Sequence, residues 1–180
     1  MVYMFLANGF EETEAIGCLD VLRRAEINVQ TVGVGGREIT GSHGITVVAD
    51  IDIDEINIAD AEGVILPGGM PGTTNLQADE RVINAVKHCA EKGRLVAAIC
   101  AAPMILGELG ILKDKIAVCY PGFEKHLEGA KIEDTSVAID GNIVTGKGAG
   151  ASMLFGARIA DWFKAGVGQE ILEQMQHLRA

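Results

Sequence analysis

The chain of 180 residues has the length of one ordinary domain, and its hydrophobic fraction of 48% is enough for a substantial core. With 22% charged residues and 23 glycines that follow no three-residue period, the composition excludes both intrinsic disorder and collagen. The formal charge of -10 would repel phosphate groups, so we expect no nucleic acid and no membrane among its partners.

No apolar run in the sequence approaches the roughly 18 residues that a membrane-spanning helix needs. The first ten residues, MVYMFLANGF, lack a basic leader and a cleavage site, so we expect a cytoplasmic protein. Such a protein does not need disulfides, and its cysteines show no close metal-binding spacing. The four cysteines are Cys18, Cys89, Cys100 and Cys119. We therefore expect no metal centre.

Continuous apolar runs predict buried strands, and apolar residues at intervals of three and four predict helices. In chain order, the first half has a strand at 2–7, a helix at 11–25, a strand at 29–34, a hairpin at 38–40 and 45–48, a short edge strand within 51–63, a strand at 63–66 and a helix at 79–92. The second half has a strand at 94–99, a helix at 101–109, a strand at 115–119, a turn-linked pair at 137–139 and 142–145, and helices at 151–164 and 169–178. This alternation predicts one α/β domain, 1–180, with a mostly parallel, doubly wound sheet and helices on both faces.

Three loops of this fold are the places where a ligand site is expected. In doubly wound sheets, ligands bind beyond the carboxyl ends of the strands, at the crevice where the winding reverses. The loops at 8–14, 67–72 and 99–103 each follow such a strand end, and each carries unusual residues. We therefore expect the functional side chains in these loops.

Cys100 stands where a buried strand turns sharply into a helix. The small residues Ala98 and Ala102 fit the strained turn of a nucleophile elbow, which presents its central side chain above the sheet. The helix start behind the sulfur is expected to lower the thiol pKa from its reference value of about 8.5. The alternative, a buried cysteine that only fills space, fits this position less well.

Glu14 is the second unusual residue of the loops. It shares one helix edge with Cys18 and Val21, so its carboxyl borders the apolar stripe, and burial there would raise its pKa. A protonated Glu14 beside Cys100 could donate a hydrogen bond to the thiolate and act as general acid or base. The alternative is that the acids of this first turn only match the helix dipole, with Glu11 as the second choice for the acid.

The paired glycines Gly68 and Gly69 follow a strand directly. Their backbone could approach a ligand closely and direct N–H groups at a developing oxyanion, although such pairs most often only turn the chain. Neither this loop nor the segment 146–150 has the spacing of a phosphate-binding fingerprint. We therefore expect no nucleotide and no other cofactor.

Four segments, taken together and in order, resemble the ThiJ/PfpI superfamily, and more closely its parkinsonism-associated deglycase branch. They are NGFEETEAIGCLDVLRR, LPGGMPGTTNL, AAICAAP and DGNIVTGKGAG. The resemblance covers nearly the whole chain. It implies a flavodoxin-like, three-layer α/β/α sandwich, usually a homodimer, in which a reactive elbow cysteine is held by a protonated glutamate. Those two positions match Cys100 and Glu14.

By the same resemblance, Gly69 and Ala101 would supply the oxyanion N–H groups, and His43 or Arg24 of a neighbouring subunit would line the pocket. One position departs from the family pattern, because many relatives carry a histidine where this chain has Tyr120. Tyr120 can donate a hydrogen bond but is a poor base at neutral pH, so a cysteine–histidine dyad is not expected. His126, six residues further on, is expected at the surface.

The elbow and the resemblance lead to one principal functional hypothesis. It is a cofactor-independent cysteine enzyme that detoxifies α-oxoaldehydes such as methylglyoxal, giving a hydroxy acid such as lactate, of the glutathione-independent glyoxalase or deglycase type. Its partners would be a small electrophilic aldehyde or a glycated adduct, and a second copy of the chain. An alternative is an oxidative-stress sensor or redox-responsive chaperone that works by oxidation of Cys100. A thiol hydrolase or peptidase is a third class, disfavoured because Tyr120 replaces the base.

Overall fold

The computed structural model describes residues 1–177 and centres on a seven-stranded sheet, whose order is β10-β11-β7-β6-β1-β2-β5. All neighbouring strands are parallel except β10 and β11, which form an antiparallel pair. In chain order these strands are β1 (Val2–Ala7), β2 (Val29–Val34), β5 (Ile51–Asp52), β6 (Gly63–Leu66), β7 (Leu95–Ile99), β10 (Val137–Asp140) and β11 (Ile143–Gly146). Two small ladders lie outside the sheet: β3 (Glu38–Thr40) with β4 (Thr46–Val48), and β8 (Ile116–Ala117) with β9 (Lys131–Ile132).

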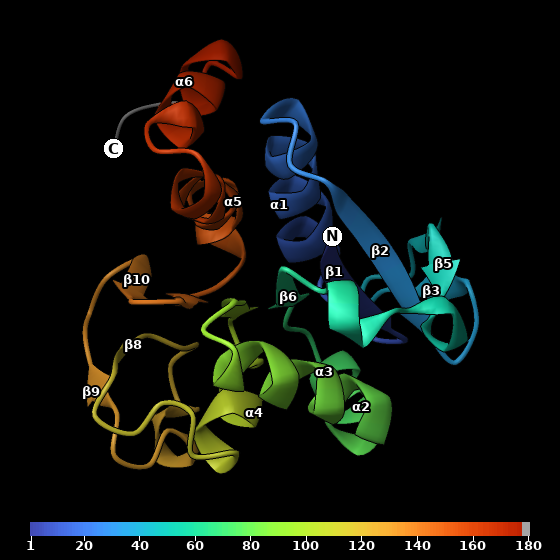
Figure 1. The fold of residues 1–180 in the computed structure, drawn as a ribbon, viewed down its shortest axis with the longest axis horizontal. Coiled ribbons are helices and arrows are strands. Elements are labelled where there is room, and N and C mark those ends of the chain that lie inside the picture. The colour runs from blue at the N-terminus through green and yellow to red at the C-terminus, as the bar shows by residue number, and fades with distance from the viewer. Residues whose placement is uncertain (178–180) are drawn as a thin grey trace.

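Helices cover both faces of the sheet, three on each (Figure 1). One layer contains α1 (Glu12–Arg24), α5 (Ser152–Phe163) and α6 (Val167–Gln174), and the other contains α2 (Gly72–Ala78), α3 (Glu80–Glu91) and α4 (Pro103–Glu108). Short 3₁₀ turns occur at Ile53–Glu55, Ile58–Asp60, Glu124–His126 and Ala149–Ala151. The predicted mostly parallel, flavodoxin-like sandwich is therefore confirmed. Within residues 1–177, every helix is too short or too polar to cross a membrane.

β1 shows why the sequences of the central strands are continuous apolar runs. All six of its residues are buried, and successive side chains point to opposite faces of the sheet. Met4 and Leu6 pack into the core beneath α1 and α5, whereas Phe5 packs into the core beneath α2 and α3. A strand with helices on both sides has no solvent-facing row, so the polar alternation of an exposed sheet is absent.

The order of the strands fixes where a site can form. The chain moves outward from β1 to β2 and β5, and then returns to the other side of β1 to build β6, β7 and β11. The winding therefore reverses between β1 and β6, and the loops that leave these two strands open a crevice at their carboxyl ends. β7 is the next strand along, so its carboxyl end borders the same crevice.

The strand predicted at 115–119 is reduced to the two residues of β8, outside the central sheet. Two of its backbone donors are bound by side chains, because the Ile116 N–H donates to Asp140 Oδ2 at 3.0 Å and the Val118 N–H donates to Thr145 Oγ1 at 3.0 Å. These bonds attach the segment beside β10 and β11 without extending the ladder. Its strand partner is β9, which the sequence pattern did not indicate.

Three other elements differ from expectation. The edge strand within 51–63 has only the two residues of β5, and 3₁₀ turns follow it. Helix α2 was not predicted, because a seven-residue helix with Leu76 as its one large buried side chain shows no apolar period. The last helix begins at Val167 and ends at Gln174, while the predicted terminal residue, Leu178, lies outside the described residues.

Phe155 connects the core to the crevice and provides a test of the packing. It is fully buried, and a side chain added at Gly146 would meet its ring, so the ring packs directly under the end of β11. We expect Phe155→Ala to reduce the free energy of unfolding by about 3 to 5 kcal/mol, measured by denaturant titration. The control Ile139→Ala, on the exposed face of β10, should lose less than about 1 kcal/mol. Equal losses would contradict this packing.

Candidate active site

The loops after β1 and β6 are interlocked through their backbones. The Glu11 N–H donates to the Gly68 carbonyl at 2.9 Å, and the Gly72 N–H donates to the Gly9 carbonyl at 3.2 Å. Gly69 adopts a φ of +88°, and a Cβ at this position would lie 2.4 Å from the Glu11 nitrogen. Glycine is therefore required at 69 both for its backbone conformation and for the close approach of the two loops.

Cys100 follows β7 at the turn toward α4, with a φ of +65° that non-glycine residues rarely adopt. Hydrogen bonds on both sides hold this conformation. The Cys100 N–H donates to the Gly146 carbonyl at 2.9 Å, and the Cys100 carbonyl accepts the Tyr120 N–H at 2.8 Å. The strained turn expected of a nucleophile elbow is present, and Cys100 is half-buried, whereas the other three cysteines are buried.

Glu14 comes from the first turn of α1 and is 1% exposed. Its Oε2 accepts the Gly68 N–H at 2.8 Å, and its Oε1 is buried without a hydrogen-bond partner among the described residues. A Cβ at Gly68 would lie 2.7 Å from both Glu14 Oε2 and the Cys100 Cβ. The missing side chain at 68 thus leaves the space in which the carboxyl faces the cysteine.

The two facing groups shift each other's titration. Burial raises the pKa of Glu14 from 4.5 to about 7, against hydrogen bonds from Cys100 and Gly68 that lower it. Burial, followed by the Glu14 charge, raises the pKa of the Cys100 thiol from 9.0 to about 12, whereas the N–H groups of Ala101 and Gly69 lower it. The net direction at Cys100 is opposite to the one expected from the helix start. The reason is that burial and an adjacent carboxylate outweigh the backbone N–H groups.

The protonation state of Glu14 decides the state of the sulfur. When Glu14 carries a proton, the negative charge that opposes thiolate formation is gone, and the carboxyl O–H can donate to the sulfur. A neutral carboxyl also places less negative charge on the buried Oε1, which has no hydrogen-bond partner among the described residues. The pair therefore titrates as a unit, in which one proton is exchanged between Glu14 and Cys100.

A cavity of about 500 Å³ opens above these groups. It is lined by Glu11, Thr13, Glu14, His43, Gly69, Cys100, Tyr120 and Ala149. Of the residues expected in the three loops, Glu14, Gly69 and Cys100 line this cavity, whereas Gly68 and Ala101 are not among its lining residues. Thr13 and Ala149 were not singled out from the sequence. Ala149 lies in the segment 146–150, which lacks the spacing of a phosphate loop and belongs to the DGNIVTGKGAG segment that carries part of the resemblance.

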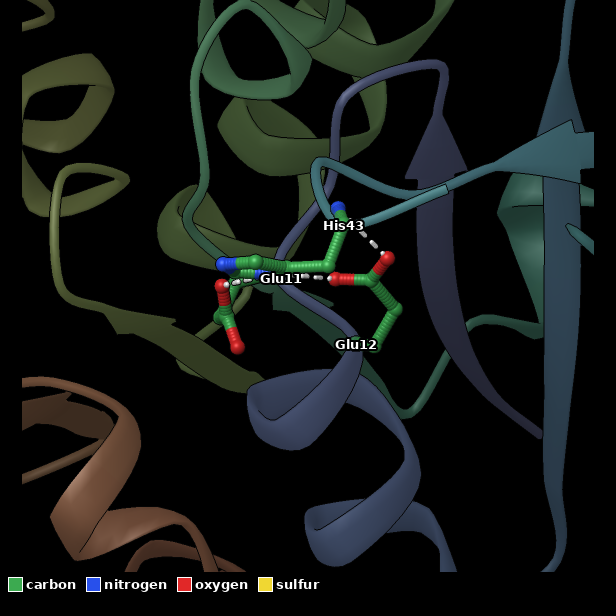
Figure 2. Close-up of side chains that lie close together, drawn as sticks. All are labelled: Glu11, Glu12 and His43. Carbon is green, nitrogen blue, oxygen red and sulfur yellow. Dashed lines mark hydrogen bonds and ion pairs between the residues drawn. The ribbon is translucent and has the colours of Figure 1, made fainter. Parts of the chain in front are cut away.

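At the rim of the cavity, His43 lies over the start of α1 between two carboxylates (Figure 2). Its Nδ1 is 2.9 Å from Glu12 Oε2 and 3.3 Å from Glu11 Oε2, and its backbone N–H donates to Glu12 Oε1 at 2.8 Å. The hydrogen bond with Glu12 raises the pKa of His43. Burial opposes ionisation of Glu12, but the hydrogen bonds from His43 and Ile45 outweigh it and lower its pKa to about 2. These bonds attach the turn at 41–44 to α1.

The same three side chains are the group, among the described residues, whose ligand atoms are close enough to hold a metal ion, all within 4.8 Å of one another. Both oxygens of Glu12 already accept hydrogen bonds from the turn at 41–44 or its neighbour Ile45. These hydrogen bonds are sufficient to explain why Glu11, Glu12 and His43 lie close together, and we assign no metal ion to the three residues.

Three further residues were considered for the pocket in the sequence analysis, namely Arg24, His43 and His126. Arg24 is in the last turn of α1, where it pairs with Asp20 at 3.0 Å. His43 lines the cavity of its own chain, and a contribution of His43 or Arg24 from a neighbouring subunit stays a prediction. His126 is not among the residues that line this cavity and contacts Glu108 at 2.8 Å, so it does not take the place of Tyr120.

The model of the DJ-1/PfpI family matches residues 1–161. The chain belongs to the DJ-1/PfpI family. A deglycase from Pyrococcus horikoshii is 31% identical over 82% of this chain and 90% of its own length. Protein DJ-1 homolog B from Arabidopsis thaliana is 34% identical over 88% of this chain, which spans only 36% of that relative.

A solved structure shows the same fold over nearly the whole length. It is a cysteine-to-alanine mutant of a DJ-1 superfamily protein from Salmonella typhimurium, with a TM-score of 0.92 and 34% identity. The match covers 99% of this chain and 98% of that one. The elbow, the buried acid and the glycine loop of this chain therefore stand on a DJ-1/PfpI scaffold.

The raised pKa of Glu14 predicts a pH-dependent stability difference between the parent and Glu14→Gln. Below pH 4.5, Glu14 is protonated in both folded and unfolded chains. Between pH 4.5 and about 7 the unfolded chain loses this proton first, so the parent loses stability relative to the variant. The difference should change by roughly 3 kcal/mol across this window and then level off, measured by urea titration at pH 4.5 to 8.

The exposed acid Glu91 offers a matched control, since Glu91→Gln reports the general effect of losing one negative charge. A difference between the parent and Glu14→Gln that stays constant from pH 4.5 to 8 would contradict the raised pKa.

Proposed function

We propose that this protein is a cofactor-independent cysteine enzyme that converts α-oxoaldehydes such as methylglyoxal into hydroxy acids such as lactate. One observation carries the proposal: the half-buried Cys100 faces the buried acid Glu14 at one cavity, and the backbone N–H groups of Ala101 and Gly69 lie close enough to bind its sulfur. Those are the nucleophile, the proton carrier and the oxyanion donors that aldehyde chemistry requires. The deglycase name of the Pyrococcus relative supports an enzyme of this general class.

In the first step, the Cys100 thiolate adds to the aldehyde carbon and forms a carbon–sulfur bond. The carbonyl electron pair moves to oxygen, where the N–H groups of Gly69 and Ala101 stabilise the negative charge. Glu14 in its protonated form then gives its proton to this oxygen, producing a hemithioacetal. The carboxyl is left as the base for the next step.

In the second step, the Glu14 carboxylate removes the hydrogen of the former aldehyde carbon as a proton and returns it to the neighbouring carbon through an enediol. The hydroxyl proton moves from the oxygen of the former aldehyde carbon to the oxygen of the former ketone carbon. The aldehyde carbon is thereby oxidised to a thioester, and the ketone carbon is reduced to an alcohol. Water then hydrolyses the thioester, releasing the hydroxy acid and the Cys100 thiol. The reaction balances as aldehyde plus water without an external oxidant, reductant or cofactor.

We further propose that the enzyme is a homodimer, as the family resemblance implies. Exposed apolar side chains support a partner surface, namely Ile16 on α1 and Ile45 and Val48 at the β3–β4 hairpin. A role for Arg24 of the second subunit and a cytoplasmic location stay predictions from the sequence.

The direct test is formation of lactate from methylglyoxal in the absence of glutathione. Cys100→Ala should abolish it, and Glu14→Gln should lower kcat/KM by about 10²-fold to 10⁴-fold, the usual contribution of a positioned acid or base. Cys119→Ala, which removes a buried cysteine outside the cavity, is the matched control and should keep the parent's activity. A Cys100→Ala protein as active as the parent would refute the mechanism.

A second candidate function is oxidation sensing, and the exposure of the cysteines favours it. Cys100 is the one cysteine of the four that is not buried, so peroxide would reach it first. The adjacent Glu14 carboxyl could stabilise a sulfinic acid by a short hydrogen bond. In this case Cys100 would be the sensing residue, and peroxide would reach its sulfur through the same cavity.

Mass spectrometry after mild peroxide treatment separates the two functions when it is combined with the lactate assay. The sensor hypothesis predicts a gain of about 32 Da, two oxygens, on the peptide that contains Cys100 and none on the Cys119 peptide. Selective oxidation without turnover of any aldehyde would favour the sensor. Oxidation spread equally over several cysteines would refute it.

A further inference from the structure

A second cavity, of about 470 Å³, adjoins the one that contains Cys100. Tyr120 and Pro121 line it on one side, and residues 147–151 line it on the other, with Ser136. Tyr120 and Ala149 belong to the walls of both cavities. A molecule attached to the Cys100 sulfur can therefore extend past these two residues into the second cavity.

The walls of the second cavity are mostly carbon. They are contributed by the Tyr120 ring, Pro121, two alanines and two glycines. The one cation at its rim, Lys147, is 2.5 Å from Asp134 and lowers the pKa of that carboxyl. Since its charge is already paired, the cavity favours an aromatic or large apolar group over an anion.

Tyr120 links the second cavity to the nucleophile. Its backbone N–H is bound to the Cys100 carbonyl at 2.8 Å, and the residue is 50% exposed. A Cβ at Gly148 would lie 3.2 Å from a carbon of the tyrosine ring, so the missing side chain at 148 keeps the space beside the ring open. Gly148 has a φ of 166°, extended backbone that any residue adopts. A larger residue there acts by filling the cavity.

We propose that this cavity binds the aromatic or large apolar substituent of the electrophile that reacts at Cys100. The inference rests on the proposed function, in which the electrophile is an α-oxoaldehyde R–CO–CHO and the cavity holds R. Methylglyoxal, with R a methyl group, fills only the cavity above the sulfur. An aromatic R buries its ring against Tyr120 and Ala149, which should favour it by about 10-fold to 100-fold in kcat/KM.

Alkylation of Cys100 tests the cavity without requiring turnover. Iodoacetamide and N-benzyl iodoacetamide form the same sulfur–carbon bond and release iodide, and they differ only in the benzyl group. With each rate divided by the rate on free glutathione, the parent should react at least about 10-fold faster with the benzyl reagent. Gly148→Leu should remove this preference while leaving the iodoacetamide rate unchanged, which also shows that the variant is folded.

A third reagent, bearing a 4-carboxybenzyl group, distinguishes an apolar subsite from an anion subsite. The parent should prefer the uncharged benzyl reagent, and Lys147→Met should keep that preference, because Lys147 is already paired with Asp134. Equal normalised rates for iodoacetamide and the benzyl reagent would overturn the proposal. So would a benzyl preference that survives Gly148→Leu, or a preference for the carboxylate that Lys147→Met abolishes.

Turnover of phenylglyoxal and methylglyoxal completes the test. The parent should show the higher kcat/KM for phenylglyoxal, and Gly148→Leu should lower only that value. If neither aldehyde is consumed but the benzyl preference holds, the proposed enzyme function fails and the binding subsite is supported. If both aldehydes are consumed with equal kcat/KM and no benzyl preference is found, the function holds and the subsite is refuted.

Discussion

At the carboxyl ends of β6 and β7, a buried carboxyl and a thiol face each other, and two negative charges cannot form there together without a large energetic cost. Burial raises the pKa of both Glu14 and Cys100, and each anion would raise the other further. One proton is therefore retained by the pair near neutral pH. With this proton on the carboxyl, the sulfur is a nucleophile; with it on the sulfur, the carboxyl is a base.

The fold supplies this pair by close backbone approach. Gly68 has no side chain to separate the carboxyl from the cysteine, and its N–H holds one carboxyl oxygen in place. Gly69 lets the loops after β1 and β6 interlock, which positions the start of α1 over the end of β7. The strained φ of Cys100 is maintained by its backbone hydrogen bonds with Gly146 and Tyr120. The packed sandwich thus holds the Glu14 carboxyl and the Cys100 sulfur in a fixed relative position.

Local sequence patterns predicted most of the fold and the identities of the two central residues, Cys100 and Glu14. They did not predict the direction in which the pKa of Cys100 is shifted. The spacing of Glu14 with Cys18 and Val21 predicted a carboxyl at the edge of the core, where the structure places it. The elbow position of Cys100 likewise followed from a strand running into a helix. The upward shift of the Cys100 pKa could not be predicted in the same way, because the burial that causes it depends on loops far apart in the chain. β8 differs for a similar reason, since side chains from β10 and β11 bind its backbone donors.

The rate of Cys100 alkylation as a function of pH, followed on its own peptide by mass spectrometry, tests the shared proton most directly. The parent should gain reactivity only at high pH, because the Glu14 carboxylate that forms near pH 7 opposes ionisation of the thiol. Glu14→Gln, which carries no charge at this position, should gain reactivity at a lower pH than the parent. Identical pH profiles for the parent and the variant would show that the two groups do not share their titration and would contradict the account.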